Sequence, residues 1–213
     1  MRAERGIFIT IEGIDGCGKS TQTSRLCDFL EDTRGRGSVL RTFEPGGWKG
    51  GALLRELLLG GIPIGARTEL LLFLADRSGH VDAEIQPALE RGDWVVCERY
   101  TDSTLAYQSW GRSLPFQEMD GLLKWCRFPV PDLTILLDID VRTALSRLEK
   151  RGGADRIESG GDGFMERVAA GYRELAGRHS ERVVTVSADR DVEEVAGDVR
   201  NCVETRVRAI RGL

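Results

Sequence analysis

The segment Gly13-Ile14-Asp15-Gly16-Cys17-Gly18-Lys19-Ser20 lies between a short β-branched run, Ile7 to Ile11, and a helical pattern that extends from Ser20 to about Thr33. The octet fits the pattern GxxxxGK(S/T) without a mismatch. Glycines at these positions allow consecutive backbone N–H groups to turn inward around an anion, and the helix that follows directs its positive end at the same point. The segment therefore predicts a phosphate-binding loop that leaves a buried strand and opens a helix.

Two side chains of this loop have a direct chemical use. Lys19 offers a point charge to the β- and γ-phosphates of a nucleotide, and the Ser20 hydroxyl is a ligand for Mg²⁺. We therefore expect ATP as the phosphoryl donor, with Mg²⁺ as its cofactor. The predicted ATP-binding residues are Gly13, Gly16, Cys17, Gly18, Lys19, Ser20 and Thr21.

Further apolar runs alternate with longer periodic segments along the rest of the chain. Such alternation is typical of a parallel sheet with helices on both faces. Besides the first strand, we predict strands at Ser38–Phe43, Trp94–Cys97, Leu133–Ile139 and Val183–Ser187. Helices are expected near residues 51–60, 68–90, 116–127, 141–150, 164–179 and 191–208. The predicted fold is a three-layer α/β fold with about five parallel strands, in a single domain over residues 1–213.

The composition argues against several classes of protein. The formal net charge of −4 is unlike the basic footprint of a nucleic-acid-binding protein. Five cysteines without a CxxC pair indicate reduced thiols rather than a disulfide framework. The N-terminal apolar run is too short and too charged in its surroundings for a signal peptide or a membrane span. We therefore expect a cytoplasmic protein that binds neither nucleic acid nor membranes.

A phosphate-binding loop alone does not distinguish a kinase from a GTPase switch or a motor ATPase. The single asparagine of the chain is Asn201, near the C-terminus, so the NKxD motif that reads guanine in GTPases is absent. This absence disfavours a guanine-nucleotide switch.

Several segments in order resemble the thymidylate kinase family of P-loop nucleotide kinases, over nearly the whole chain. The loop is similar to the family's EGxDGxGKSTQ, and Glu44-Pro45-Gly46-Gly47 to the end of its REPGG segment. Residues 70–81 (LLLFLADRSGHV) are similar to its LLFxADRxxHV helix, and residues 98–108 (ERYTDSTLAYQ) to its DRYxDSxxAYQ. Finally, residues 155–158 (DRIE) resemble its DRxE. The resemblance implies a homodimeric enzyme that phosphorylates dTMP to dTDP with Mg-ATP, in the synthesis of dTTP.

An acceptor site follows from the same resemblance and from the chemistry of its residues. Arg99 follows a buried strand, where a guanidinium can hold a phosphate through two parallel hydrogen bonds. Phe73 and Arg77 lie one helical turn apart, so a stacking ring and a donor for a base carbonyl share a face. By resemblance, Tyr107 excludes a 2′-hydroxyl and Asp15 reaches the 3′-hydroxyl. The predicted substrate-binding residues are Asp15, Glu44, Arg55, Phe73, Arg77, Arg99, Ser103, Thr104, Tyr107 and Gln108.

Two positions depart from the family pattern. Glu98 stands where the family has Asp; we expect it to serve Mg²⁺ together with Ser20. Phe43 stands where Arg is expected, which places more of the phosphate binding on Arg55 and Arg99.

The phosphate-binding loop of this chain also lacks an arginine, so the resemblance implies a catalytic arginine in a lid at about residues 147–163. The lid candidates are Arg147, Lys150, Arg151 and Arg156, and the predicted catalytic residues are Lys19, Glu98, Arg99 and Arg151.

Three points remain open from the sequence. Glu98 keeps a deoxynucleoside kinase as the alternative function, and a nucleotide-dependent switch or binding module is the alternative from another class. The resemblance implies a cis peptide bond between Glu44 and Pro45. Cys17 lies at the positive end of a helix beside Lys19, and both effects would stabilise a thiolate if the side chain is exposed.

Overall fold

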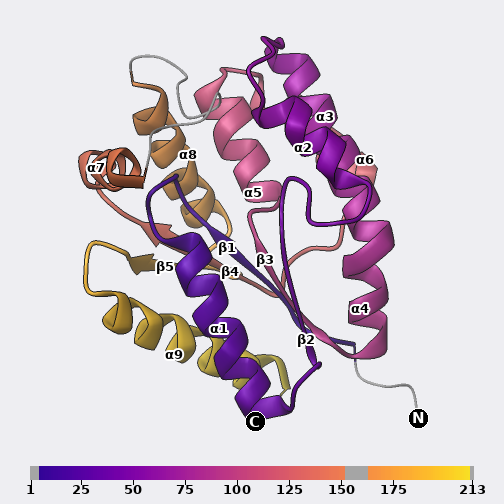
Figure 1. Cartoon of the computed structure of the whole chain (residues 1–213), viewed down its shortest axis with the longest axis vertical. Coiled ribbons are helices and arrows are strands. Elements are labelled where there is room, and N and C mark those ends of the chain that lie inside the picture. Colours follow the sequence, from indigo (N-terminus) through magenta and orange to yellow (C-terminus); the bar gives the residue numbers. More distant parts are fainter. Residues whose placement is uncertain (1–4, 152–162, 212–213) are drawn as a thin grey trace.

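The computed structural model describes residues 5–151 and 163–211, without the side chains of residues 151 and 211. Its sheet is parallel throughout, with the strand order β2-β3-β1-β4-β5 (Figure 1). The strands are β1 (Phe8–Glu12), β2 (Val39–Phe43), β3 (Trp94–Glu98), β4 (Leu133–Asp138) and β5 (Val183–Ser187). The predicted α/β fold with five parallel strands is therefore confirmed.

The central strand, β1, determines where a ligand would lie. Its five residues are all buried, as expected for an apolar strand covered on both faces. It pairs with β3 on one side and β4 on the other, so that Ile11 lies beside Glu98 and Glu12 beside Leu136. The carboxyl ends of these strands therefore meet at one edge. Crossovers leave in opposite directions there, which opens a crevice of the kind that binds ligands in α/β proteins.

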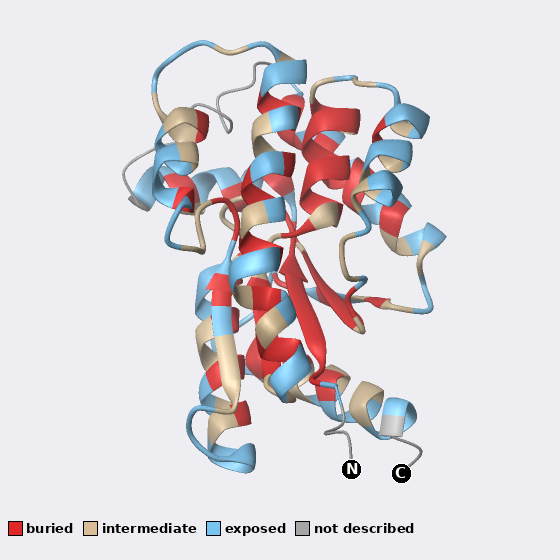
Figure 2. Cartoon of the chain, turned by 90° about the vertical axis from the view of Figure 1, so that its right-hand side faces the viewer, coloured by how far each residue is buried: buried red, intermediate tan, exposed pale blue. Residues whose placement is uncertain are grey.

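Helices cover both faces of the sheet. On one face lie α1 (Lys19–Arg34) and α9 (Val192–Arg211), which pack against each other; α4 (Gln86–Arg91) and α8 (Phe164–Arg178) contact the other (Figure 1). The buried residues concentrate in the strands and on the helix surfaces that face them (Figure 2). The other helical elements are α2 (Gly51–Leu59), α3 (Ala66–His80), η1 (Val81–Ile85), α5 (Thr101–Thr104), η2 (Leu105–Gly111), α6 (Phe116–Cys126) and α7 (Val141–Arg151).

Two helical segments differ from the prediction. The helix expected at residues 68–90 is three consecutive elements, because the π-helical segment η1 separates α3 from α4. Residues 101–111 form α5 and η2, for which no helix was predicted. Most of this second segment is buried, including polar side chains such as Asp102 and Gln108, so it lacks the alternation of apolar and polar faces that reveals a surface helix.

Candidate active site

The loop between β1 and α1 has the backbone that its glycines predict. Gly13, Gly16 and Gly18 all have positive φ angles, of 140°, 84° and 95°. Space as well as conformation requires the first two glycines: a Cβ on Gly13 would lie 2.6 Å from the carbonyl oxygen of Leu137, and one on Gly16 2.3 Å from that of Ala144. The loop therefore fits closely against β4 and α7 and leads directly into the N-terminus of α1.

Lys19 is held inside this loop. Its side chain is 5% exposed, and Nζ donates a hydrogen bond of 2.9 Å to the carbonyl oxygen of Ile14. The same ammonium lies 3.5 Å from the carboxylate of Asp15. The positive charge is thus fixed at the position where the loop would hold phosphate groups.

Ser20 and Glu98 come together although 78 residues separate them. Ser20 is in the first turn of α1 and Glu98 ends β3, and the Ser20 hydroxyl donates to Oε1 of Glu98 at 3.0 Å. A hydroxyl and a carboxylate oxygen are both hard ligands, and Mg²⁺ binds through few protein oxygens while it retains several waters. The donor set therefore fits Mg²⁺.

The condition set for a stabilised thiolate at Cys17, an exposed side chain, is not met. Cys17 is 2% exposed and belongs to the main hydrophobic core. Burial raises the pKa of its thiol above the ordinary value, and this effect outweighs the nearby charges of Lys19 and Arg99. Its side chain fills the space beside Gly13, which leaves it the role of a small packing residue.

A cleft of about 480 Å³ opens at the carboxyl edge of the sheet. All ten side chains predicted to bind the substrate line this cleft, as do Ser20 and Glu98. Four more lining residues were not predicted for the site: Arg41, Phe43, Pro45 and Leu59. The structure therefore brings together segments that lie far apart in the sequence, and it adds an arginine to them.

Arg99 is the most heavily coordinated of these side chains. Its backbone is left-handed, with φ at 66°, which is uncommon for a residue other than glycine. The guanidinium forms an ion pair with Asp15 and donates to the hydroxyls of Ser103, Tyr107 and Tyr172 and to the carbonyl oxygen of Gly13. Burial alone would raise the pKa of Asp15, but the charges of Arg99 and Lys19 outweigh it and hold that pKa below its usual range.

Glu12 and Tyr172 lie behind Arg99, and the sequence analysis assigned neither of them to the site. The Glu12 carboxylate is fully buried and accepts hydrogen bonds from the backbone N–H of Tyr100, from Ser103 and from Tyr172. Burial, followed by the nearby charge of Asp102, raises the pKa of Glu12 to about 7. Tyr172 belongs to α8 and therefore connects that helix to the cleft; no motif surrounds it, so the sequence offered no signal for it.

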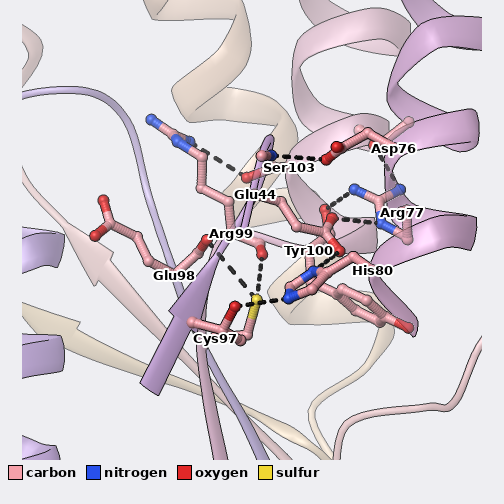
Figure 3. Close-up of polar contacts among 12 residues, drawn as sticks. Glu44, Asp76, Arg77, His80, Cys97, Glu98, Arg99, Tyr100 and Ser103 are labelled. Carbon is pink, nitrogen blue, oxygen red and sulfur yellow. Dashed lines mark hydrogen bonds and ion pairs between the residues drawn. The ribbon is translucent and has the colours of Figure 1, made fainter. Parts of the chain in front are cut away.

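At the opposite end of the cleft, Arg77 is 1% exposed and pairs with a residue that was itself assigned to the substrate. Its Nε donates to Glu44 Oε2 at 2.7 Å, while its Nη atoms donate to Thr104 Oγ1 and to the carbonyl oxygen of Tyr100, both at 2.9 Å. His80 lies on the other side of this carboxylate, 3.0 Å from Glu44 Oε1 (Figure 3). The Glu44–Pro45 bond is cis, as predicted.

Glu44, His80 and Cys97 form a second group of potential metal ligands, with ligand atoms within 4.8 Å of one another. Each already has a partner: Glu44 pairs with Arg77, His80 contacts Thr42 at 2.6 Å, and the thiol of Cys97 donates to the carbonyl oxygen of Arg99. Burial raises the pKa of Cys97 well above its ordinary value, which disfavours the thiolate that a metal requires. This group is better explained as a hydrogen-bonded support beneath the cleft.

Gln108, predicted to bind the substrate, is held by Glu69, which the sequence analysis did not assign to the site. Its Nε2 donates to Glu69 Oε1 at 3.0 Å, and Arg112 neutralises the same carboxylate at 3.1 Å. Glu69 is 1% exposed, so this pair fixes the amide of Gln108 from below the cleft.

The structure describes only part of the predicted lid. Arg147 donates to the carbonyl oxygen of Ala188 at 3.3 Å, so it is attached to the end of β5, and Lys150 is exposed. The side chain of Arg151 and the whole of Arg156 lie outside the described residues.

Comparison with known proteins agrees with these features. The family model of thymidylate kinase matches residues 11–199. The chain is 48% identical over 195 residues to a thymidylate kinase of Alkalilimnicola ehrlichii, covering 90% of this chain and 89% of that one. It is 40% identical to one of Ruthia magnifica, covering 92% and 97%. The crystal structure of thymidylate kinase from Ehrlichia chaffeensis superposes with a TM-score of 0.79 at 30% identity, over 94% of this chain and 99% of that one.

Within residues 5–151 and 163–211, no helix combines the length and apolar character needed to cross a membrane. The phosphate-binding loop, the arginine-lined cleft beside it and these relatives lead to one conclusion. The chain belongs to the thymidylate kinase family.

Proposed function

We propose that this chain transfers the γ-phosphoryl group of ATP to the 5′-phosphate of dTMP. One observation carries the proposal: the loop that holds Lys19 and Ser20 opens into the same cleft as Arg99, Arg77 and Phe73. A phosphate-binding loop therefore faces a second site that offers a phosphate ligand, a hydrogen-bond donor and an aromatic ring.

In the proposed reaction, an oxygen of the acceptor phosphate forms a bond to the γ-phosphorus. The bond from this phosphorus to the β–γ bridging oxygen breaks, and ADP leaves with the electron pair. The acceptor oxygen is already anionic, so no general base is needed. The protein has to position two phosphates that repel each other and neutralise their charge.

Lys19 is the proposed cation on the donor side and Arg99 on the acceptor side. Because Arg99 pairs with Asp15 in this structure, an incoming dianionic phosphate has to compete with that carboxylate. Asp15 would then be available to the sugar hydroxyl. Ser20 and Glu98 would hold Mg²⁺, which supplies further charge neutralisation on the phosphates when it is bound.

The proposed base site is at the other end of the cleft. The phenyl ring of Phe73 is a stacking surface there, while Thr104 and Gln108 are polar groups fixed by Arg77 and Glu69. The Tyr107 hydroxyl donates a hydrogen bond to Asp15, the residue proposed for the sugar hydroxyl. This contact supports the placement of Tyr107 against the sugar.

A deoxynucleoside kinase is the alternative, and Glu98 is the residue that favours it. Arg55 argues for the monophosphate acceptor, because it lines the cleft without a carboxylate partner among the described residues. An ADP-release assay with dTMP, dUMP, thymidine or no acceptor separates these functions. We expect turnover with dTMP; turnover with thymidine alone would establish the alternative, and equal ADP release without acceptor would indicate a nucleotide hydrolase or switch.

We further propose a homodimer, which the family resemblance implies. Large apolar side chains support it: Leu71 on α3 is 60% exposed and Trp125 on α6 is 80% exposed. The end of α6 lies close to α3, since Phe128 contacts Arg77. Analytical ultracentrifugation of Trp125→Asp tests this interface, and we expect the variant to sediment as a monomer.

All five cysteines are free thiols, which supports a cytoplasmic location.

A further inference from the structure

Among residues 5–151 and 163–211, four arginines line the cleft, and two of them are neutralised before any ligand binds. Arg77 pairs with Glu44 and Arg99 with Asp15. An anion that approaches either guanidinium has to compete with a carboxylate of the protein itself.

The remaining two, Arg41 and Arg55, have no carboxylate partner within residues 5–151 and 163–211. Arg55 donates to the carbonyl oxygen of Pro45 at 2.6 Å and lies over the ring of Phe43, 5.3 Å from its centroid. Arg41 donates to the hydroxyl of Ser24 at 2.9 Å, its one hydrogen bond within the described part of the chain, and its side chain is exposed. These two guanidinium groups are therefore the positive charges of the described cleft that are available to an anion.

The position of Arg41 suits a phosphate rather than a base. Side chains alternate along a strand, so Arg41 and Phe43 point to the same side of β2. Arg41 lies two residues, or about 7 Å, further from the carboxyl edge, and its long side chain offsets that distance to reach the cleft. Its partner Ser24 is one helical turn after Ser20 on α1. The guanidinium thus lies near the end of the cleft that the phosphate-binding loop closes.

We propose that Arg41 binds the 5′-phosphate of the acceptor, together with Arg55. This inference rests on the proposed function and adds a residue to it. Phe43 occupies the position where the family pattern has an arginine, and Arg41 supplies a guanidinium from the same face of the same strand. When the Arg41 guanidinium leaves Ser24, it exchanges a hydrogen bond to a neutral hydroxyl for one to a charged phosphate. The second bond is the stronger, because both of its partners are ionised.

The competing explanation is that Arg41 only attaches β2 to α1 through Ser24. Two variants separate the explanations. Arg41→Gln removes the charge, whereas Ser24→Ala removes the hydrogen bond and leaves the charge in place. Arg25→Gln is the control for the loss of a nearby positive charge, because Arg25 follows Ser24 on α1, pairs with Glu193 and does not line the cleft.

The measurement is calorimetric binding of dTMP and of thymidine, the latter carrying no phosphate. We expect Arg41→Gln to weaken dTMP binding about tenfold and to leave thymidine binding unchanged. Ser24→Ala and Arg25→Gln should bind both as the unaltered protein does. The double variant Arg41→Gln, Phe43→Arg should recover most of the loss, since it returns a guanidinium to the same face of β2.

Three results would overturn the role of Arg41: unchanged dTMP affinity in Arg41→Gln, equal weakening of dTMP and thymidine, or the same loss in Ser24→Ala. Failure of the proposed function looks different. In that case the unaltered protein itself would fail to phosphorylate dTMP in the ADP-release assay, whatever residue stands at position 41.

Discussion

Arg77 Nε donates to Glu44 Oε2 at 2.7 Å, and the two side chains are 1% and 3% exposed. This buried ion pair joins α3 to the segment that follows β2, and both of its residues line the cleft where we propose the base site. Breaking a buried ion pair by removing one partner is costly, because it leaves the other charge without compensation in a medium of low dielectric constant. The stability of the fold and the proposed base site therefore depend on the same contact.

Glu44→Ala should lower the free energy of unfolding by about 3 to 5 kcal/mol, since Arg77 would remain as an uncompensated buried cation. Urea unfolding followed by circular dichroism measures the loss. The double variant Glu44→Leu, Arg77→Met, which buries no charge at either position, should recover a large part of it. A loss below 1 kcal/mol in Glu44→Ala would show that the pair contributes little to the fold.

Lys19→Ala removes the ammonium that the loop holds beside Ile14 and Asp15. We expect turnover to fall by a factor of a hundred or more, on the order of 3 kcal/mol of transition-state stabilisation. Steady-state kinetics at saturating ATP and dTMP measure the effect. Lys124→Ala is the matched control, because Lys124 is an exposed lysine on α6. Turnover of Lys19→Ala within tenfold of the unaltered enzyme would remove this loop from the catalytic machinery.

Arg99→Ala should impair dTMP binding much more than ATP binding, because the proposed partner of Arg99 is the acceptor phosphate. The expected loss in dTMP affinity is about a hundredfold, corresponding to a hydrogen-bonded charge pair of about 3 kcal/mol. Calorimetry with each nucleotide separately gives the two values. Arg99→Lys keeps the charge but not the two parallel hydrogen bonds, so its dTMP affinity should lie between those of the unaltered protein and Arg99→Ala. Equal weakening of both nucleotides would contradict an acceptor-side role.

Much of this architecture was accessible from residue patterns. Short β-branched runs predict the buried strands, and the glycines of the phosphate-binding loop predict its backbone conformation. Residues 101–111 were missed as a helix because burial of Asp102, Ser103 and Gln108 removes the amphipathic pattern on which such predictions depend. Ser103 and Gln108 line the cleft instead of facing bulk solvent, and Asp102 pairs with Arg182.

The pairing of charges within the cleft could not be predicted from the sequence. Motif spacing identified Arg77 and Arg99 as cleft residues but not their carboxylate partners, which come from segments 33 and 84 residues away. Arg41 was overlooked because the motif directs attention to Phe43, two residues later. Its contribution becomes visible only when β2 is placed beside α1 and the cleft.

Glu12 should make the stability of the fold depend on pH. Its carboxyl is fully buried at the end of β1, and burial, with the charge of Asp102, raises its pKa from 4.5 to about 7. Between these two values the folded state keeps the proton that the unfolded state has released. The free energy of unfolding therefore falls as the pH rises through this window, by about 3 kcal/mol in all, and levels off above pH 7.

Glu12→Gln removes the titrating group and should abolish this contribution. A glutamine can keep the bond from the backbone N–H of Tyr100, and its amide N–H groups can donate to the hydroxyls of Ser103 and Tyr172 once these turn to accept. Urea unfolding at pH 5, 6, 7 and 8, taken as the difference between the two proteins, isolates Glu12 from every group that they share. We expect the difference to favour the unaltered protein most at pH 5 and to shift toward Glu12→Gln up to pH 7. A difference that is constant over this range would mean that the buried carboxyl keeps an ordinary pKa.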